Sequence, residues 1–399
     1  MDQRQRAVES LVVSKLFDGV YAGRRVLVTG HTGFKGSWLC LWLRELGAQV
    51  TGLALPPPTD PNHFDLLKLD IESHIHDIAD AAAVERVLDS SRPEMVFHLA
   101  AQPLVLCSYK QPVETFRTNL QGLVNVLESC RRTDSVRAVV VVTSDKCYEN
   151  RNWPWPYRES DRLGGHDPYS ASKAAAEIIA HSYRQSFFAG PGSARLATAR
   201  AGNVIGGGDW AANRLLPDLA RAAAAGTRLR IRCPQAVRPW QHVLDCLSGY
   251  LTLGQRLLAT KKGTGSEPPS SRARQDGGGE VPVPFFGDAM NGQAAWNFGP
   301  DPNSCRTVAD VIAEAARHWP AVRWEHDGQP HPVETHLLQL DTSLARAGLR
   351  WTPAWDWRRA VAETVAWYAA FQAGRVATRG QLATYVADAQ TAQVAWAVK

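Results

Sequence analysis

The sequence predicts an α/β protein built on a doubly wound parallel sheet. From residue 24 onward, short apolar segments alternate with helical segments of roughly ten to fifteen residues, the pattern of parallel βαβ units. The expected strands are so apolar that helices must cover both faces of their sheet. The first of them also runs directly into a glycine-rich turn, GHTGFKG, at residues 30–36.

The expected elements follow in order along the chain. A buried strand at Arg24–Thr29 precedes a helix at Gly36–Leu46, in which Trp and Leu side chains recur at helical spacing. Further strands are expected at Gln49–Leu53, Ser73–Ile78, Glu94–Leu99, Ala138–Val142 and Arg195–Arg200, and helices at 79–90, Phe116–Arg132 and Arg358–Ala373.

The second half of the chain is less regular. Gly202–Trp210 is too rich in glycine for a strand interior and predicts a loop. Residues 261–280 have the composition of a flexible insertion with nothing to bury. We therefore expect an N-terminal extension at 1–22, a sheet domain at 23–202, a smaller mixed α/β domain at 203–385 and a C-terminal tail at 386–399.

The composition excludes several classes of protein. The chain has 399 residues, of which 45% are hydrophobic and 21% charged, so a sizeable core is available. Its net charge of +5 is spread along the chain, which argues against a nucleic-acid patch. The seven cysteines show neither paired nor metal-ligand spacing and fit reduced thiols. Because no signal peptide or membrane span is visible, we expect a cytoplasmic protein.

The glycine turn points to a dinucleotide. Its glycines stand at 30, 33 and 36 between a strand and a helix, where a Rossmann-like fold binds a pyrophosphate. A nucleoside-triphosphate loop needs lysine after the last glycine, whereas the order here is Lys35-Gly36-Ser37. Residues 52–58, at the end of the second strand, lack a basic residue for a 2′-phosphate, which favours NAD over NADP. Asp77, near the end of the third strand, either accepts a hydrogen bond from the adenine amino group or is only a favourable negative charge near the start of the next helix.

A second motif, DPYSASK, carries the candidate chemistry. It places Tyr169 and Lys173 four residues apart, on one face of an expected helix. A fixed ammonium lowers the pKa of a nearby phenol, so Tyr169 is predicted to take an alcohol proton while hydride leaves for the cofactor. Ser144, at the end of the strand Ala138–Val142, is expected beside it.

Together these motifs resemble the extended short-chain dehydrogenase/reductase family, and within it the CDP-glucose branch of the nucleotide-sugar 4,6-dehydratases. The resemblance spans residues 22–370 and is carried by GHTGFKGSW (30–38), FHLAAQPLV (97–105), TSDKCYEN (143–150), DPYSASK (167–173), RAGNVIGGGDW (200–210), RPWQHVLD (238–245) and WNFGP (296–300). It implies NAD-dependent dehydration of CDP-D-glucose to CDP-4-keto-6-deoxy-D-glucose, a precursor of deoxysugars. The steps would be oxidation at C4, loss of water across C5 and C6, and hydride return to C6.

The resemblance also implies roles for individual residues. The cofactor would be held by Gly30, Gly33, Phe34, Lys35, Gly36, Asp77, Ile78, Ala100, Ala101, Gln102, Asn119, Tyr169 and Lys173. The nucleotide sugar would be bound, in the smaller domain, by Asn203, Arg214 and Arg238. No metal ion is expected. A homodimer is implied, formed through the helices that contain Asn119 and Tyr169.

Ser144, Asp145 and Lys146 complete the expected catalytic set. An adjacent Asp–Lys pair at a strand end is usually a solvated surface pair. Dehydration, however, requires a base at C5 and an acid at the C6 hydroxyl. A desolvated carboxyl group can be protonated, so Asp145 is predicted to be the acid. Lys146 is either the C5 base, if burial lowers its pKa, or a cation that stabilises the enolate.

Other functions share parts of this pattern. A nucleotide-sugar epimerase, or a dehydratase acting on another nucleotide, would keep the glycine turn, Tyr169 and Lys173, but an epimerase needs no acid–base pair for loss of water. A non-catalytic dinucleotide sensor often lacks the tyrosine or the lysine, and both are present here. The segment Trp153–Pro156 is either a lid over the site or a packed turn.

Overall fold

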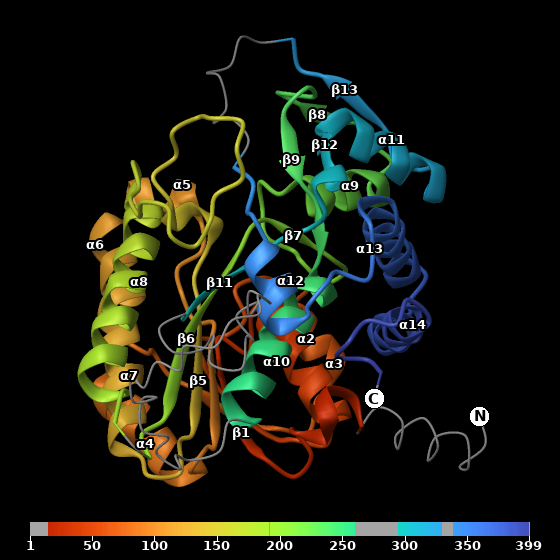
Figure 1. Ribbon diagram of the computed structural model, residues 1–399. Coiled ribbons are helices and arrows are strands. Elements are labelled where there is room, and N and C mark those ends of the chain that lie inside the picture. Colours follow the sequence, from red (N-terminus) through yellow and green to blue (C-terminus); the bar gives the residue numbers. More distant parts are fainter. Residues whose placement is uncertain (1–14, 191, 260–293, 329–337, 399) are drawn as a thin grey trace, which may run out of the picture.

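The computed structural model describes residues 15–190, 192–259, 294–328 and 338–398 (Figure 1). Within them, a seven-stranded parallel sheet forms the centre of the molecule, in the order β11-β6-β5-β4-β1-β2-β3. This is the strand order of dinucleotide-binding folds, and it confirms the predicted doubly wound sheet. The strands are β1 (Arg25–Thr29), β2 (Gln49–Ala54), β3 (Glu72–Ile75), β4 (Met95–His98), β5 (Ala138–Val142), β6 (Arg195–Ala201) and β11 (Ala295–Phe298).

Helices cover both faces of the sheet, because successive side chains of a buried strand point in opposite directions. In β1, Val26 and Val28 pack on one face and Leu27 on the other. The first face is covered by α2 (Phe34–Glu45), α10 (Val243–Ala259) and α12 (Ser343–Leu349), with α3 (His63–Leu67) against α2. The second face is covered by α4 (Ala81–Ser91), α7 (Gly122–Arg132) and α8 (Pro168–Phe187) (Figure 1).

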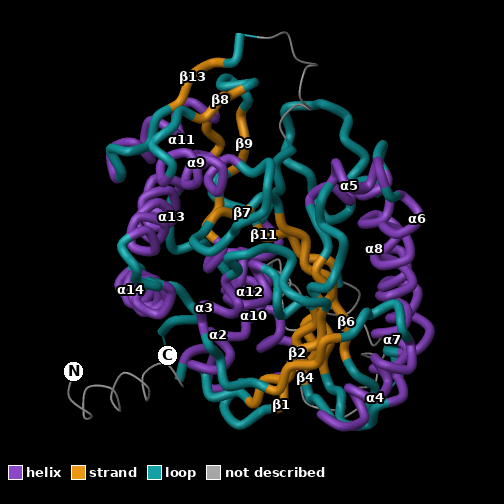
Figure 2. Tube along the Cα trace, turned by 180° about the vertical axis from the view of Figure 1, so that it is seen from behind, coloured by secondary structure: helices purple, strands orange, loops and turns teal. Residues whose placement is uncertain are grey.

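Two short helices, α5 (Val105–Lys110) and α6 (Pro112–Phe116), lie against α8. A π-helical turn, η2 (Arg117–Gln121), joins α6 to α7. The single helix predicted at Phe116–Arg132 therefore contains one wider turn. Seen from behind, α5, α6 and α8 lie along one flank of the molecule, and α13 (Trp357–Gln372) and α14 (Thr378–Thr391) along the other (Figure 2).

A smaller lobe lies beside the main sheet and has a core of its own (Figure 1). Its described strands form three pairs: β7 (Val204–Ile205) with β10 (Gln241–His242), β9 (Val237–Pro239) with β12 (Cys305–Thr307), and β8 (Leu229–Ile231) with β13 (Trp324–His326). Around them are α9 (Leu215–Ala224), α11 (Val308–His318), α13 (Trp357–Gln372) and the 3₁₀ turn η5 (Pro302–Ser304).

The C-terminal helix α14 (Thr378–Thr391) and the tail after it pack near α2. Trp396 stacks on Tyr385 and on Phe17 of the turn η1 (Leu16–Gly19), with ring centroids 5.7 and 5.0 Å apart. It also meets Trp42 of α2 edge-on at 5.6 Å. Among the described residues, no helix is long and apolar enough to cross a membrane.

Chain order and spatial arrangement differ after residue 202. Both α10 and β11 come after this point, yet β11 pairs with β6 and α10 covers the main sheet. The segment Gly202–Trp210, predicted to be a loop, contains the two-residue strand β7. The predicted insertion at 261–280 and residues 1–14 of the N-terminal extension lie outside the described residues. The domain boundaries stay predictions.

Candidate active site

The turn after β5 carries three of the predicted catalytic residues. Ser144 caps the short 3₁₀ helix η3 (Asp145–Cys147), because its Oγ accepts a hydrogen bond from the Lys146 N–H at 3.2 Å. The same hydroxyl donates to Oδ1 of Asp145 at 2.8 Å. Ser144 and Asp145 are both buried. With Asp145 buried and Lys146 half-buried, the two residues are not the fully solvated surface pair that the sequence alone would allow.

Helix α8 holds Tyr169 beside this turn. The helix is capped by Asp167, which accepts a hydrogen bond from the Ser170 N–H at 2.9 Å. Tyr169 is buried, and burial raises its pKa to about 12, although a hydrogen bond with Ser144 lowers it. The expected lowering of this pKa is wrong, because desolvation outweighs the neighbouring charges.

Lys173 lies one turn further along α8 and is also buried. Burial and the positive charge of Lys35 lower the pKa of Lys173 to about 8. Its Nζ donates to the backbone oxygen of Val142, the last residue of β5, at 3.5 Å. The ammonium group is thus held directly before the turn that contains Ser144.

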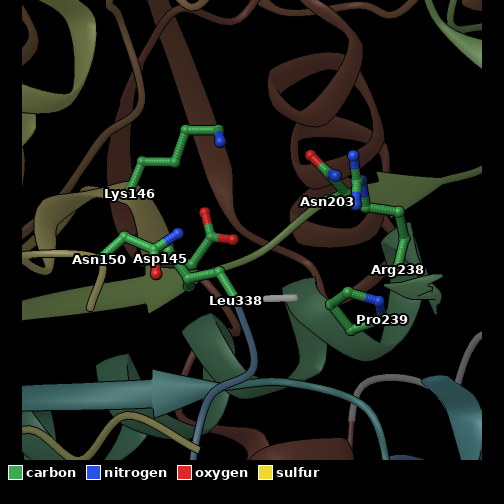
Figure 3. A pocket seen from close by; sticks show the side chains of 7 residues that line it. All are labelled: Asp145, Lys146, Asn150, Asn203, Arg238, Pro239 and Leu338. Carbon is green, nitrogen blue, oxygen red and sulfur yellow. The ribbon is translucent and has the colours of Figure 1, made fainter. Parts of the chain in front are cut away.

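A pocket opens beside this turn, where η3 meets β9 of the smaller lobe (Figure 3). Lys146 extends on one side of it, and the side chains of Asn203 and Arg238 lie together on the other. Two predicted acid–base residues and two predicted substrate contacts therefore meet in one place. The described residues that line the pocket are Asp145, Lys146, Asn150, Asn203, Arg238, Pro239 and Leu338.

In the aromatic segment after the turn, Trp153 packs against the protein and Trp155 does not. The Trp153 ring lies 5.2 Å from that of Tyr157, whereas Trp155 is 69% exposed. Neither tryptophan is among the described residues that line the pocket. These contacts favour a packed turn over a lid.

The glycine turn forms a cradle at the N-terminus of α2. Gly30 has a φ of +78°, and a Cβ there would lie 2.7 Å from the backbone nitrogen of Ala100. A Cβ on Gly36 would lie 2.0 Å from the Gly30 carbonyl oxygen. Gly33 caps the helix, and no side chain of the described residues takes up the first N–H groups of α2. These free donors fit a pyrophosphate, so the residues present suit a dinucleotide. Phe34 and Lys35 form the first turn of the helix.

The other predicted cofactor residues have clear structural partners. Asn119 accepts a hydrogen bond from the Gln102 N–H at 2.8 Å and donates to the Ser172 hydroxyl at 2.8 Å. It thereby ties the segment after β4, which contains Ala100 and Ala101, to the helix of Tyr169. The Ala100 N–H donates to Thr29 Oγ1 of β1 at 3.2 Å.

Asp77 follows β3 and uses both of its carboxylate oxygens within the protein. Oδ2 accepts from Arg117 Nη2 at 2.9 Å, and Oδ1 accepts from the Ala79 N–H at 2.9 Å. Ile78 is buried and packs on Gly122, where a Cβ would lie 2.5 Å from its side chain. A contact of Asp77 and Ile78 with adenine stays a prediction.

Arg214 is not among the described residues that line the pocket. Its guanidinium group pairs with the buried Asp209 at 2.8 Å. Its positive charge acts to lower the pKa of Tyr169.

Three pocket residues carry no sequence prediction. Asn150 is the last residue of the motif TSDKCYEN, and Pro239 belongs to RPWQHVLD. Their place in these motifs could have predicted that they line the pocket. Leu338 stands in no motif, and its place in the pocket comes from the fold alone. No group of three or more His, Cys, Asp or Glu side chains in the described ranges could hold a metal ion.

A parallel sheet of this order, with a glycine cradle and a buried Tyr–Lys pair beside a pocket, defines a dinucleotide-dependent enzyme acting on a small substrate. Residues 26–264 match the NAD dependent epimerase/dehydratase family, and the chain belongs to this family. The cofactor of this family is NAD, which agrees with the dinucleotide predicted from the glycine turn and with the preference for NAD predicted from residues 52–58.

One relative is similar to this chain over most of its length. It is 43% identical over 362 residues to a CDP-glucose 4,6-dehydratase from Salmonella typhimurium, covering 89% of this chain and 93% of that enzyme. Solved structures share its fold. An epimerase from Methanothermobacter thermautotrophicus superposes with a TM-score of 0.72 at 22% identity, covering 93% of this chain and 98% of the other. A UDP-glucose 4-epimerase from Thermus thermophilus, in complex with NAD, gives 0.67 at 23% identity, with 86% and 99% covered.

Proposed function

We propose that the protein is an NAD-dependent hydro-lyase that converts CDP-D-glucose to CDP-4-keto-6-deoxy-D-glucose. The observation that carries the proposal is the pocket, in which Asp145 and Lys146 stand on the same turn as Ser144, whose hydroxyl acts to lower the pKa of Tyr169. The candidate base for the oxidation and the acid–base pair for the loss of water thus belong to one site. The 43% identity to a CDP-glucose 4,6-dehydratase over most of both chains supports this substrate.

Oxidation of the sugar at C4 is the task of Tyr169. Bound NAD supplies the hydride acceptor and afterwards the hydride donor. The Tyr169 side chain acts as a phenolate: it takes the proton of the C4 hydroxyl, becomes the phenol, and returns the proton at the end of the cycle. Ser144 and the positive charge of Arg214 act to lower the pKa of Tyr169 and so favour this phenolate against the effect of burial.

Loss of water across C5 and C6 is the task of the neighbouring pair. Asp145 is buried and already accepts a hydrogen bond from Ser144, which orients its carboxyl group. Its Oδ2 lies 3.3 Å from the Cβ position of Gly202, so a side chain there would press on the carboxyl group. In its carboxylic acid form Asp145 gives its proton to the departing C6 hydroxyl, which leaves as water, while a base takes the C5 proton.

Lys146 lines the same pocket and acts at C5, either as the base or as a cation that stabilises the enolate. The variant Lys146→Met separates the two roles through solvent deuterium incorporation at C5. Loss of incorporation identifies Lys146 as the base. Undiminished incorporation together with slow product formation removes it from that role.

We further propose that Arg238 and Asn203 bind the nucleotide diphosphate, since both line the pocket opposite Lys146 (Figure 3). Arg214, which pairs with Asp209, would add positive charge to this site. A guanidinium group is well suited to a diphosphate because its donors form a planar fork.

The proposed function is tested by incubating the protein and NAD with CDP-, TDP-, UDP- and GDP-glucose. A 4-keto-6-deoxy sugar absorbs in strong alkali, whereas a 4-epimer does not. We expect the alkali-absorbing product from CDP-glucose. An epimer from any of these substrates, or keto product from another nucleotide only, contradicts the proposal.

We propose a homodimer as well. The flank formed by α5, α6 and α8 exposes Leu106, Tyr109, Val113 and Ile178, each between 59% and 79% exposed. An apolar surface of this kind on neighbouring helices is typical of a subunit interface.

We also propose a cytoplasmic location. All seven cysteines are free thiols, which supports it.

A further inference from the structure

A buried ion pair lies behind the catalytic turn. Arg200 of β6 and Glu177 of α8 meet at 2.8 Å, with side chains only 4% and 3% exposed. Glu177 stands one helical turn after Lys173, on the same face of α8. The negative charge of Glu177 holds the pKa of Arg200 above its ordinary value despite burial.

The two members of this pair bind the two ends of the turn. At its start, the Thr143 hydroxyl donates to Oε1 of Glu177. At its end, the Tyr148 hydroxyl accepts from Nη1 of Arg200 at 2.7 Å and donates to Asn297 of β11 at 2.8 Å. The residues between these two ends are Ser144, Asp145, Lys146 and Cys147.

Stability alone does not explain such a pair. Taking two charges out of water costs several kcal/mol, and apolar side chains of similar volume often stabilise a core as well or better. What a buried pair adds is geometry, because each charged group accepts or donates only along fixed directions. Here those directions connect α8 to both ends of the catalytic turn.

We propose that Glu177 and Arg200 are positioning residues that hold the turn of Asp145 and Lys146 in register with Tyr169 and Lys173. Oxidation at C4 and dehydration at C5 and C6 require groups from two different elements to reach one sugar. The ion pair is the rigid link between these elements. This role in the reaction rests on the proposed function.

A matched set of variants tests the link. Thr143→Val and Tyr148→Phe each remove one hydroxyl that joins the turn to the pair. Thr198→Val is the control: its hydroxyl also bonds Glu177, at 2.7 Å, and it is as buried as Thr143, but it lies on β6 and not on the turn. All three substitutions keep the shape of the side chain, so their effects on unfolding should be similar.

The first readout is amide hydrogen exchange of the peptide that contains residues 143–148, measured on the full chain without substrate. The two turn variants should exchange roughly five- to tenfold faster there, the equivalent of one net hydrogen bond. Thr198→Val should stay close to the wild type. Equal acceleration in all three variants, or none in the turn variants, would overturn the proposal.

The second readout separates the two halves of the reaction with CDP-glucose. In the turn variants, dehydration should slow on the order of ten- to a hundredfold. Reduced nicotinamide should then accumulate during turnover and be visible by its absorbance. Thr198→Val should keep the wild-type ratio of the two signals. A uniform slowing of both signals contradicts the positioning role. Failure of the wild type to turn over CDP-glucose would instead refute the proposed function and leave the exchange result to decide on the link.

Discussion

Lys173 provides a quantitative test of the site because its ammonium group is buried. In the folded protein, burial and the charge of Lys35 lower its pKa from 10.5 to about 8. The unfolded chain therefore binds this proton more tightly than the folded chain does. The stability of the fold should rise with pH between these two values, because stability increases wherever the unfolded state holds more protons.

The expected magnitude follows from the two pKa values of Lys173. One unit of pKa corresponds to about 1.4 kcal/mol. Between about pH 8 and about pH 9.5, the folded state loses most of its proton and the unfolded state keeps nearly all of it, so the free energy of unfolding should gain about 1.5 kcal/mol. The variant Lys173→Met has no proton to lose and should lack this gain.

Urea unfolding of the wild type and of Lys173→Met at the two pH values measures the difference. Lys110→Met, at the exposed end of α5, is the control and should follow the wild type. Other titrating groups are common to all three proteins and cancel in the comparison. Parallel pH dependence of the wild type and Lys173→Met would refute the view that Lys173 is held in a desolvated site beside another positive charge.

Three further predictions concern cofactor, chemistry and assembly. Gly36→Ala should weaken NAD binding at least about tenfold in a calorimetric titration, because its Cβ would lie 2.0 Å from the Gly30 carbonyl oxygen. The control Gly380→Ala has open space around its Cβ and should bind NAD normally. Tyr169→Phe should lower kcat by on the order of a hundredfold or more while NAD affinity stays within about threefold; unchanged kcat would remove Tyr169 as the base. Val113→Glu, at a position 79% exposed on α6, should shift the protein to monomers in sedimentation without loss of thermal stability, and an unchanged dimer would place the interface elsewhere.

The sequence was sufficient for the parts of the fold that depend on local pattern. The first six strands of the main sheet lie within a few residues of their expected positions, because each is a short apolar run between turn and helix signals. The glycine cradle was predictable for the same reason. The meeting of Asp145 and Lys146 with Asn203 and Arg238 followed from the resemblance of motifs rather than from spacing.

Other features depend on contacts between distant parts of the chain. The seventh strand, β11, is four residues long and follows a segment without periodic pattern, so only its pairing with β6 defines it. The bonds of Thr143 and Tyr148 to the Glu177–Arg200 pair likewise join separate elements. The sign of the Tyr169 pKa shift was predicted wrongly because the sequence shows the neighbouring lysine but not the depth of burial.

The most direct test of the proposed reaction uses CDP-glucose that carries deuterium at C4. Oxidation at C4, loss of water and hydride return to C6 predict that the deuterium is recovered at C6 of the keto product, with a solvent-derived hydrogen at C5. The position of the label is read by NMR. Deuterium that stays at C4, or that is lost to solvent, would contradict the account.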